Sequence, residues 1–442
     1  MKTSIVIFSD DFRIIDNPAL FHAAEKYQNI IPVYIYDENY LGRKLGSASK
    51  IFLKNVLLSF NNLLQKEYNI KLIIKKGNKF DEINKIIATN KIDAVYFNHS
   101  YTSSEIAFEN EIKKKQNIDV RSFKAKLLFD PWEIKPLSGL EYYRVFTPFS
   151  KECIKKFGDI KPIHPKPKIS QSIHSISTLS AEDLDLDPPI NQGNWAEDLL
   201  KNWSFDYTTI EEKFKQFVKT KIHNYKEDRN IPEKNSTSMM SPYLRFGVIS
   251  PKFCLYQGIT ETNQSDNFFS LELLWREFAY HAMFYNQNIA TIELKFQYGN
   301  FVWQENQDFF EKWTQGKTGF DIVDAGMMEL WKTGVMHNRI RMITASFLIK
   351  DLLIDWKKGE HWFWNTLVDA DPAINPSSWQ WVFGSGFDAS PYFRIFNPES
   401  QKEKFDPNST YCKKWLRSDW KPLKIVNHDT QRKITLEKYK NL

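Results

Sequence analysis

Residues 3–37 read TSIVIFSDDFRIIDNPALFHAAEKYQNIIPVYIYD, and this stretch decides the fold of the first part of the chain. The apolar run at 3–9 is typical of a buried strand, 18–27 has helical spacing, and 30–36 is a second strand run. The alternation continues, with a helix predicted at 48–66, a strand at 70–74, a helix at 80–87 and a strand at 94–97. Strands that alternate with helices favour βαβ units and a parallel sheet.

The rest of the chain divides into two further parts. Five prolines stand among Ser, Ile and Asp residues in 160–192, which indicates a long connecting segment over the surface. From residue 195 onward, apolar residues recur three and four apart and strand patterns are scarce. We therefore predict an α/β domain at 1–130, a linker at 131–199, and a large all-helical domain at 200–442.

The composition excludes several classes of protein. The 442 residues include 60 Lys and Arg against 54 Asp and Glu, a net charge of +6, and 42% are hydrophobic, which excludes a disordered chain. We find no run of ~18 apolar residues for a membrane span and no signal peptide. The three cysteines lie far apart and predict no metal site. A cytoplasmic protein is expected.

Hydroxyl residues precede a helical pattern in the stretch NSTSMMSPYLRFG at 235–247. Thr237, Ser238 and Ser241, together with the N–H groups of a helix N-terminus, are typical of a phosphate site. An ordinary helix cap without a ligand is the alternative, and spacing alone favours it.

A second motif, ELLWREF at 272–278, places Glu272, Trp275 and Arg276 on one helical face. This combination suits a pocket that holds a flat ring with polar edges. A surface ion pair between Glu272 and Arg276 beside a half-buried Trp275 explains the pattern equally well.

A third motif, GVMHNRIRM at 334–342, carries Asn338 and Arg341 three positions apart, while Arg339 points elsewhere. Arginines near a buried face need carboxylates or phosphates, and Asp369 and Asp371 are candidate partners. A structural ion pair is also an adequate explanation.

Tryptophans are concentrated in the second half of the chain, including Trp379 and Trp381 in the turn-rich segment NPSSWQW at 375–381. Such rings can pack in a core or stack on bases and other flat rings. Together, these motifs predict a helical domain that binds a flat, anionic ligand.

Four long blocks occur in order: FSDDFRIIDNPAL at 8–20, MHNRIRMITASFLIKDLLIDW at 336–356, DADPAINPSSWQW at 369–381 and YFRIFNPESQ at 392–401. Through these blocks the chain resembles the photolyase/cryptochrome family, nearest to the bacterial class I cyclobutane pyrimidine dimer photolyases. The resemblance covers nearly the whole chain. It implies a Rossmann-like antenna domain, a linker, and a helical domain that holds FAD in a U-shaped form.

The resemblance also implies roles for matching residues. Arg341 and Asp369 should lie as a pair against the flavin ring, and Asn375 should face its N5 atom. The residues implied to bind FAD are Tyr225, Thr237, Ser238, Met239, Met240, Ser241, Arg276, Asn338, Arg341, Asp369, Ala370, Asp371 and Asn375.

The implied activity is light-driven repair of UV-damaged DNA, in which excited, reduced, anionic FAD donates an electron to a flipped-out dimer. Glu272 should hydrogen-bond the dimer, and Trp275 and Trp381 should form an apolar wall beside it. The remaining implied DNA contacts are Asn338, Arg229 and Arg339. Trp379, Trp356 and Trp303 match the family's electron-hopping chain from the flavin to the surface.

Several points stay open within the resemblance. Glu105 matches the family's folate-holding glutamate, but Ser104, Ala290 and Thr291 depart from the folate pattern, so the antenna is methenyltetrahydrofolate, a deazaflavin or none. His337-Asn338 argues against the (6-4) branch, which carries a His–His pair. We expect a monomer. The alternatives to repair are a cryptochrome-type blue-light photoreceptor and a helical nucleic-acid binder without flavin.

Overall fold

The computed structural model describes residues 2–115, 117–136, 139–170, 172–188, 194–420 and 422–442. Its first part is built around a five-stranded parallel sheet with the order β3-β2-β1-β4-β5. The strands are β1 Thr3–Phe8, β2 Asn29–Tyr36, β3 Ile73–Lys76, β4 Ala94–Asn98 and β5 Asp119–Phe123. The central strands β1, β2 and β4 are buried along their whole length, which is why they appear in the sequence as continuous apolar runs.

Helices cover this sheet, as predicted. They are α1 Pro18–Lys26, α2 Ser47–Tyr68, α3 Lys79–Thr89 and α4 Ser103–Ile112. Asn17 begins α1 because its side chain accepts a hydrogen bond from the Leu20 N–H, and Pro18 has no N–H to leave unpaired. The α/β fold class is therefore confirmed. The sequence patterns had not located α4 or β5.

The connecting segment is less superficial than the sequence suggested. It contains η1 Pro131–Glu133, α5 Phe146–Lys155, η2 Phe157–Asp159 and η3 Glu182–Leu184. Three apolar side chains attach this segment to the main core, where they are buried: Ala181, Leu184 and Leu186. Residues 137–138, 171 and 189–193 of the predicted linker lie outside the described residues.

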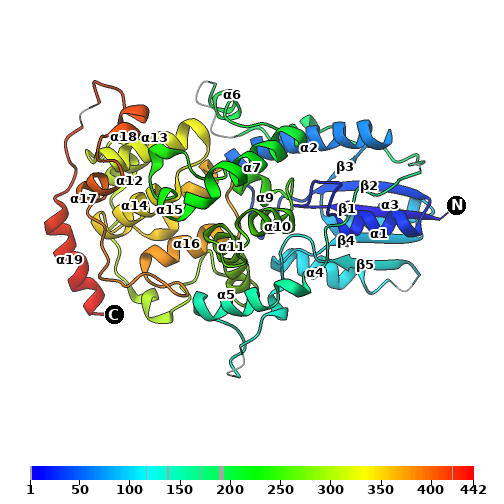
Figure 1. Cartoon of the computed structure of the whole chain (residues 1–442), viewed down its shortest axis with the longest axis horizontal. Coiled ribbons are helices and arrows are strands. Elements are labelled where there is room, and N and C mark those ends of the chain that lie inside the picture. Colours follow the sequence, from blue (N-terminus) through cyan, green and yellow to red (C-terminus); the bar gives the residue numbers. More distant parts are fainter. Residues whose placement is uncertain (1, 116, 137–138, 171, 189–193, 421) are drawn as a thin grey trace.

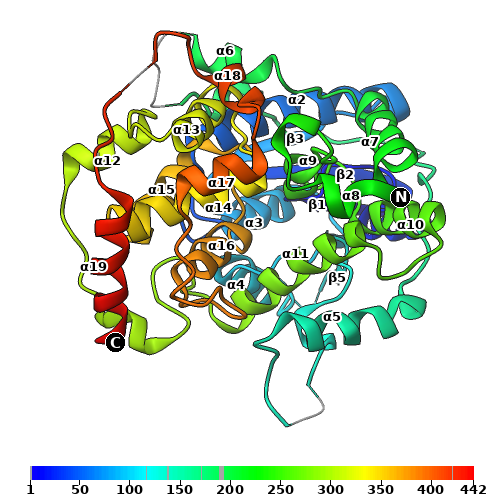
Figure 2. The ribbon, with the colours of Figure 1, turned by 60° about the vertical axis from the view of Figure 1, so that its left-hand side comes forward.

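The remaining part is helical, which confirms the second half of the fold prediction. Its elements are α6 Trp195–Leu200, α7 Tyr207–Lys221, η4 Ile222–Asn224, α8 Tyr225–Asp228, η5 Pro232–Lys234, α9 Ser241–Arg245, α10 Pro251–Thr262, α11 Phe268–Tyr285, η6 Phe296–Asn300, α12 Gln307–Thr314, α13 Asp321–Thr333, α14 Asn338–Ser346, η7 Phe347–Asp351, α15 Trp356–Thr366, α16 Ile374–Phe383, α17 Pro398–Phe405, α18 Thr410–Trp415 and α19 His428–Lys440. Figure 1 shows α19 at the end of the molecule opposite the sheet. Helix α16 contacts α11, α14 and α15, and Figure 2 shows these helices grouped in the helical part.

One local prediction was wrong. The segment 375–381 is not turn-rich but belongs to helix α16. Asp371 starts this helix by accepting hydrogen bonds from the N–H groups of Ala373 and Ile374. Pro376 stands in the first turn, where the N–H that proline lacks would have no partner within the helix.

The two parts of the protein are packed closely against each other. Lys126 and Arg245 both pair with Asp10 at 2.7 Å, and all three side chains are almost fully buried. Two glycines allow the close approach. A Cβ atom at Gly247 would lie 2.2 Å from the Asp10 carbonyl oxygen, and one at Gly46 would lie 1.9 Å from the Trp364 carbonyl oxygen. Larger residues at either glycine would push the two parts away from each other.

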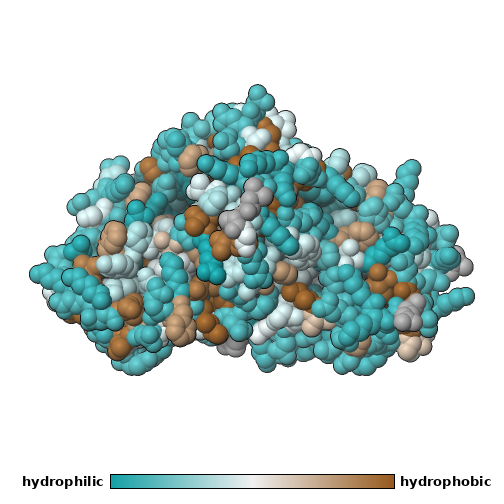
Figure 3. Space-filling view, turned by 90° about the horizontal axis from the view of Figure 1, so that it is seen from below, coloured by the Kyte–Doolittle hydropathy of each residue, from teal (hydrophilic) through white to brown (hydrophobic). Residues whose placement is uncertain are grey.

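In the described part of the chain, no helix combines the length and apolar character needed to cross a membrane. Figure 3 shows one face of the molecule, on which hydrophilic residues predominate and hydrophobic residues form small, separated groups.

Candidate functional site

The carboxylate of Asp369 joins helices α9 and α14 of the helical part. Its Oδ2 atom accepts hydrogen bonds from Ser241 Oγ at 2.6 Å and from Arg341 Nη2 at 2.8 Å. Arg341 also donates through Nε to the Met336 carbonyl oxygen. The Oδ1 atom of Asp369 is buried and has no protein partner among the described residues. The predicted Arg341–Asp369 pair is thus present, with one carboxylate oxygen left over.

The loop after Asp369 is held from both sides. The Ala370 carbonyl oxygen accepts a hydrogen bond from Arg245 Nε at 2.9 Å. Asp371 accepts one from the Tyr280 hydroxyl at 2.7 Å, in addition to its contacts with the start of α16. These bonds fix the backbone that carries Asp369, Asp371 and, one turn later, Asn375.

Arg276 and Glu277 form a buried pair on α11. Arg276 Nη1 lies 3.2 Å from Glu277 Oε1, and both side chains are at most 7% exposed. Glu277 Oε2 accepts hydrogen bonds from the N–H groups of Leu128 and Phe129, which ties the helix to the end of the α/β domain. The second terminal nitrogen of Arg276, Nη2, is buried and has no protein partner among the described residues.

Burial raises the pKa of Glu277 from 4.5 to about 7, against the opposing effect of Arg276. Between these pH values the folded protein binds more protons at this group than the unfolded chain does. The free energy of unfolding should therefore fall as the pH rises from about 4.5 to 7, by about 2–3 kcal/mol from this group. Glu277→Gln should flatten this dependence, because an amide side chain does not titrate. Its oxygen can still accept the two N–H bonds, so the local structure is kept.

Urea unfolding at several pH values measures the effect. The exposed Glu261 on α10 offers a matched control through Glu261→Gln, which should leave the pH dependence unchanged. Equal slopes in the wild type and Glu277→Gln would contradict the assignment.

The 237–241 segment has a strained backbone. Met239 takes a left-handed φ of 56°, which is uncommon for a residue other than glycine, and its side chain is 44% exposed. Ser238 Oγ accepts from the Met240 N–H, while Met240 is buried. Thr237 is partly buried. Helix α9 has only five residues, and Ser241 bonds to Asp369 instead of capping it. The predicted phosphate contacts stay a prediction.

Tyr225, Arg229 and Glu272 lie together. The Arg229 guanidinium lies 5.6 Å from the centre of the buried Tyr225 ring, and its Nη2 lies 2.7 Å from Glu272 Oε2. Burial raises the pKa of Glu272 and raises that of Tyr225 to about 12. The glutamate implied for dimer recognition is therefore half-shielded and paired with an arginine implied for DNA.

The arginine beside Asn338 also lies close to other cations. Arg339 Nη2 donates to Asn230 Oδ1 at 2.7 Å, and its Nε atom is buried without a partner among the described residues. Burial first, and then Arg229 and Arg394, lower the pKa of Arg339. Sequence reasoning had not assigned Arg394 a role, although the YFRIFNP block contains it. Three guanidinium groups close together favour an anionic ligand.

The two tryptophans of the implied lesion wall are partly buried. Trp275 stacks on Phe146, with ring centres 3.7 Å apart and an interplanar angle of 7°. Trp381 continues α16, and its carbonyl oxygen accepts from the Ser390 N–H.

The three tryptophans of the implied electron path differ in their surroundings. Trp379 is buried and packs against Phe363 and Trp313, with ring centres 5.0 and 6.2 Å away. Trp356 is fully buried and donates its indole N–H to Glu293. Trp303 is partly buried and packs against Phe383. Their electron-transfer role is not tested by these contacts.

Glu105, the implied antenna residue, is buried in the first turn of α4. Both of its carboxylate oxygens accept hydrogen bonds from Lys79 Nζ, at 2.5 and 2.7 Å. Lys79 also donates to Ser9 Oγ. The glutamate is thus engaged inside the α/β domain, and an antenna contact stays a prediction.

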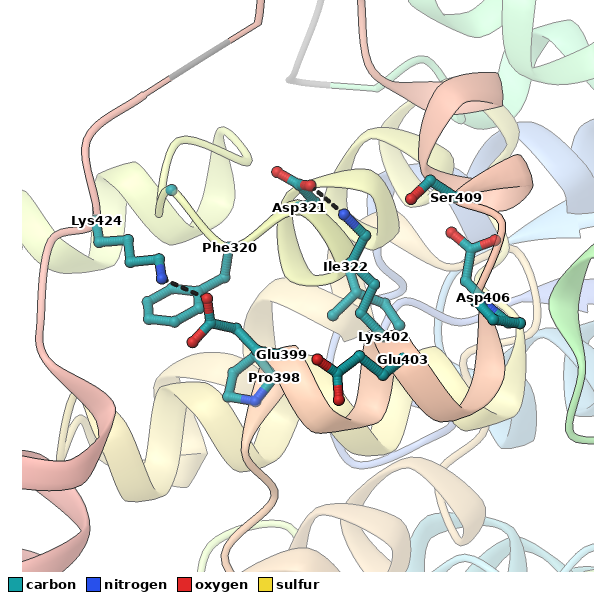
Figure 4. A pocket seen from close by; sticks show the side chains of 12 residues that line it. Phe320, Asp321, Ile322, Pro398, Glu399, Lys402, Glu403, Asp406, Ser409 and Lys424 are labelled. Carbon is teal, nitrogen blue, oxygen red and sulfur yellow. Dashed lines mark hydrogen bonds and ion pairs between the residues drawn. The ribbon is translucent and has the colours of Figure 1, made fainter.

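A pocket of about 430 Å³ lies elsewhere, between α13, α17 and the segment around Lys424 (Figure 4). Two ion pairs cross it, Lys402–Asp321 and Lys424–Glu399, each at 2.5 Å. None of the residues predicted for FAD or DNA lines this pocket.

The family of this chain follows from comparison with known proteins. The family model described as the FAD binding domain of DNA photolyase matches residues 269–421, and the one described as DNA photolyase matches residues 4–170. A deoxyribodipyrimidine photo-lyase of Agrobacterium fabrum is 37% identical over 425 residues, which cover 94% of this chain and 88% of the relative. Fold and sequence together define a two-domain flavoprotein architecture. The chain belongs to the photolyase/cryptochrome family.

Two further relatives refine this picture. The crystal structure of a bacterial class III photolyase from Agrobacterium tumefaciens has a TM-score of 0.93 and 34% identity, and it covers 100% of this chain and 98% of that one. Cryptochrome-2 of Arabidopsis thaliana is 32% identical over 94% of this chain and 70% of its own length. The class III match leaves the predicted class I membership unconfirmed.

The residues present fit the FAD of a photolyase FAD-binding domain. Asp369 Oδ1 offers a buried acceptor, and Arg276 Nη2 offers a buried donor, each without a protein partner among the described residues. A flavin carries both donors and acceptors on its ring edge, so it can satisfy both atoms. Buried polar atoms are normally paired, and these two therefore indicate a ligand.

Proposed function

We propose that this chain repairs cyclobutane pyrimidine dimers in UV-damaged DNA with light, as a deoxyribodipyrimidine photo-lyase. The observation that carries the proposal is one face of α11. Arg276 has a buried nitrogen without a protein partner among the described residues, and it would donate to the cofactor. Glu272 and Trp275, four residues and one residue before it on the same helix, would contact the lesion. A cofactor and a substrate that share one helix face lie close enough for electron transfer.

When bound, reduced FAD would supply the photoexcited electron that opens the cyclobutane ring. The protein supplies binding and orientation. Asp369 and Arg341 would hold the flavin edge, and the Asp371 cap keeps α16 and Asn375 in position. The arginines Arg229, Arg339 and Arg394 would attract the phosphate backbone. A dimer pairs and stacks poorly, so its extrusion costs less than that of normal bases.

The direct test is illumination of the reduced, purified protein with a thymine-dimer oligonucleotide. We expect a flavin absorption spectrum and a loss of dimers under blue light. A flavin-containing protein that leaves the dimers intact would contradict repair and favour the photoreceptor function suggested by the cryptochrome relative. A preparation that stays colourless when FAD is added would contradict both.

Replacement of Glu272 by alanine should impair recognition of the lesion more than binding of DNA in general. The half-shielded Glu272 carboxylate is the proposed partner of the dimer's base edge, and a charged hydrogen bond contributes about 1.5–3 kcal/mol. We expect the preference for dimer-containing over undamaged DNA to fall by about 10- to 100-fold, measured by competition binding.

The control for this variant is Glu261→Ala, which removes an exposed glutamate from the neighbouring helix α10. It should leave the preference unchanged. An unchanged preference in Glu272→Ala would remove Glu272 from the lesion site.

The proposal also covers the domain boundaries, the photolyase class, the oligomeric state and the form of the flavin. We propose the domain division at 1–130, 131–199 and 200–442, and the separate family matches at 4–170 and 269–421 support a different domain at each end. Between class I and class III, the TM-score of 0.93 to a class III photolyase favours class III. We propose a monomer that works on the reduced, anionic flavin. An absorption band beyond those of the flavin would report an antenna.

A further inference from the structure

Asn375 is linked to the α/β domain by a chain of hydrogen bonds. Its Nδ2 atom donates to Glu360 Oε1 at 2.8 Å and to the Glu360 carbonyl oxygen at 3.1 Å. Both carboxylate oxygens of Glu360 in turn accept from Arg43, at 2.6 and 2.8 Å. Arg43 lies in the segment between β2 and α2, so the chain crosses from one part of the protein to the other.

The link is rigid at each step. The Glu360 side chain is 3% exposed, and a bidentate contact with a guanidinium fixes its plane. The guanidinium carbon of Arg43 lies 3.4 Å above the centre of the Trp364 ring. The indole N–H of Trp364 donates to the Lys44 carbonyl oxygen, next to Arg43 in sequence. Stacking and hydrogen bonding therefore leave Arg43 little freedom.

These contacts determine which atom Asn375 can offer to a ligand. An amide nitrogen carries two hydrogens, and both are donated to oxygens of Glu360. A carbonyl oxygen and a carboxylate oxygen accept hydrogen bonds, so the amide cannot turn around and keep both contacts. The Oδ1 atom of Asn375 accepts no hydrogen bond from the described residues. Asn375 therefore presents an acceptor, not a donor, on its free side.

We propose that Arg43 is a positioning residue for the flavin chemistry: its two hydrogen bonds fix the Glu360 carboxylate, and Glu360 holds Asn375 with its oxygen toward the flavin. The inference rests on the proposed function, in which Asn375 faces flavin N5. An acceptor at this position stabilises the reduced forms of flavin that carry a proton on N5, the two-electron-reduced form among them. Oxidised flavin has no such proton and gains nothing from it.

Loss of Arg43 should weaken this preference. Without Arg43, the Glu360 carboxylate loses the two hydrogen bonds that fix its plane. It can then turn away from the Asn375 amide, and the amide can turn its NH₂ group outward. Asn375 can then present its NH₂ group instead of its oxygen to flavin N5.

The experiment is redox titration of FAD bound to Arg43→Met, compared with the wild type. We expect about a tenfold loss in the preference for reduced over oxidised FAD. For a two-electron couple this lowers the midpoint potential by about 30 mV. Glu360→Gln, which replaces one of the two acceptor oxygens by an NH₂ group, should lower the potential by a similar amount. Arg43→Lys keeps the charge and should have a smaller effect.

Lys44→Met is the matched control. Lys44 is the next residue in the same segment, its side chain pairs with Glu38, and it does not touch Glu360. This variant should keep the wild-type potential. Should Arg43→Met fail to hold FAD, Glu360→Gln still decides the question. Wild-type potentials in Arg43→Met or Glu360→Gln would overturn the inference and leave the proposed repair activity untouched, whereas a wild type that binds no FAD would overturn the proposed function itself.

Discussion

The Asp369→Ala protein is expected to fold but to be isolated with little bound FAD. Asp369 holds Ser241 and Arg341 together through one oxygen and keeps the other oxygen free for the ligand. Its removal takes away this acceptor and leaves the Arg341 guanidinium, whose side chain is only 25% exposed, without its carboxylate. Breaking a buried pair from one side costs about 3–5 kcal/mol.

We therefore expect the affinity for FAD to fall by more than about 100-fold, measured by titration of the flavin-free protein with FAD. Asp321→Ala serves as a control, because this aspartate also pairs with a basic residue in the helical part but is 54% exposed. It should bind FAD as the wild type does. If Asp369→Ala retained its flavin, the site would have to be placed elsewhere.

The second large effect is expected for Trp379→Phe. Phenylalanine keeps an aromatic ring against Phe363 and Trp313 but is far harder to oxidise than an indole. If Trp379 is the first donor to the excited flavin, light-driven reduction of oxidised FAD should slow by an order of magnitude or more. Repair by protein that has been reduced chemically beforehand should be much less affected, because this step does not use the tryptophan path.

Absorption spectroscopy under blue light with an external thiol reductant measures the rate of flavin reduction. Trp331→Phe provides the matched control, since Trp331 stacks on Trp195 and Trp362 in another part of the helical domain. This variant should photoreduce at the wild-type rate. Equal rates in Trp379→Phe and the wild type would exclude Trp379 from the path.

The sequence predicted the fold class because parallel strands that are buried on both faces must be apolar along their length. The prediction failed where tertiary contacts decide local structure. One proline and two serines made 375–381 resemble a turn, yet the Asp371 carboxylate caps a helix there. Likewise, apolar residues are sparse between 160 and 192, so the few that reach the core, such as Leu184, could not be recognised.

Part of the candidate site could also be predicted from the sequence, and part could not. The pair between Arg341 and Asp369 could be inferred because a buried arginine needs a carboxylate, and few carboxylates stood in suitable blocks. The contact between Arg43 and Glu360 could not be inferred, because 317 positions separate the two residues and neither stands in a recognisable motif. Arg394 was overlooked for a different reason, since one arginine in a loop has no periodicity.

The glycines at the junction bear on how this protein can be recombined with its relatives. Gly46 and Gly247 let the backbones of the two parts touch. Arg43, which donates to Glu360, lies three residues before Gly46 in the sequence. A chimera that takes its first 130 residues from a relative with a larger residue at position 46 would dock in a shifted orientation. The α/β part and the helical part are therefore expected to be inherited as a matched pair, not exchanged as independent modules.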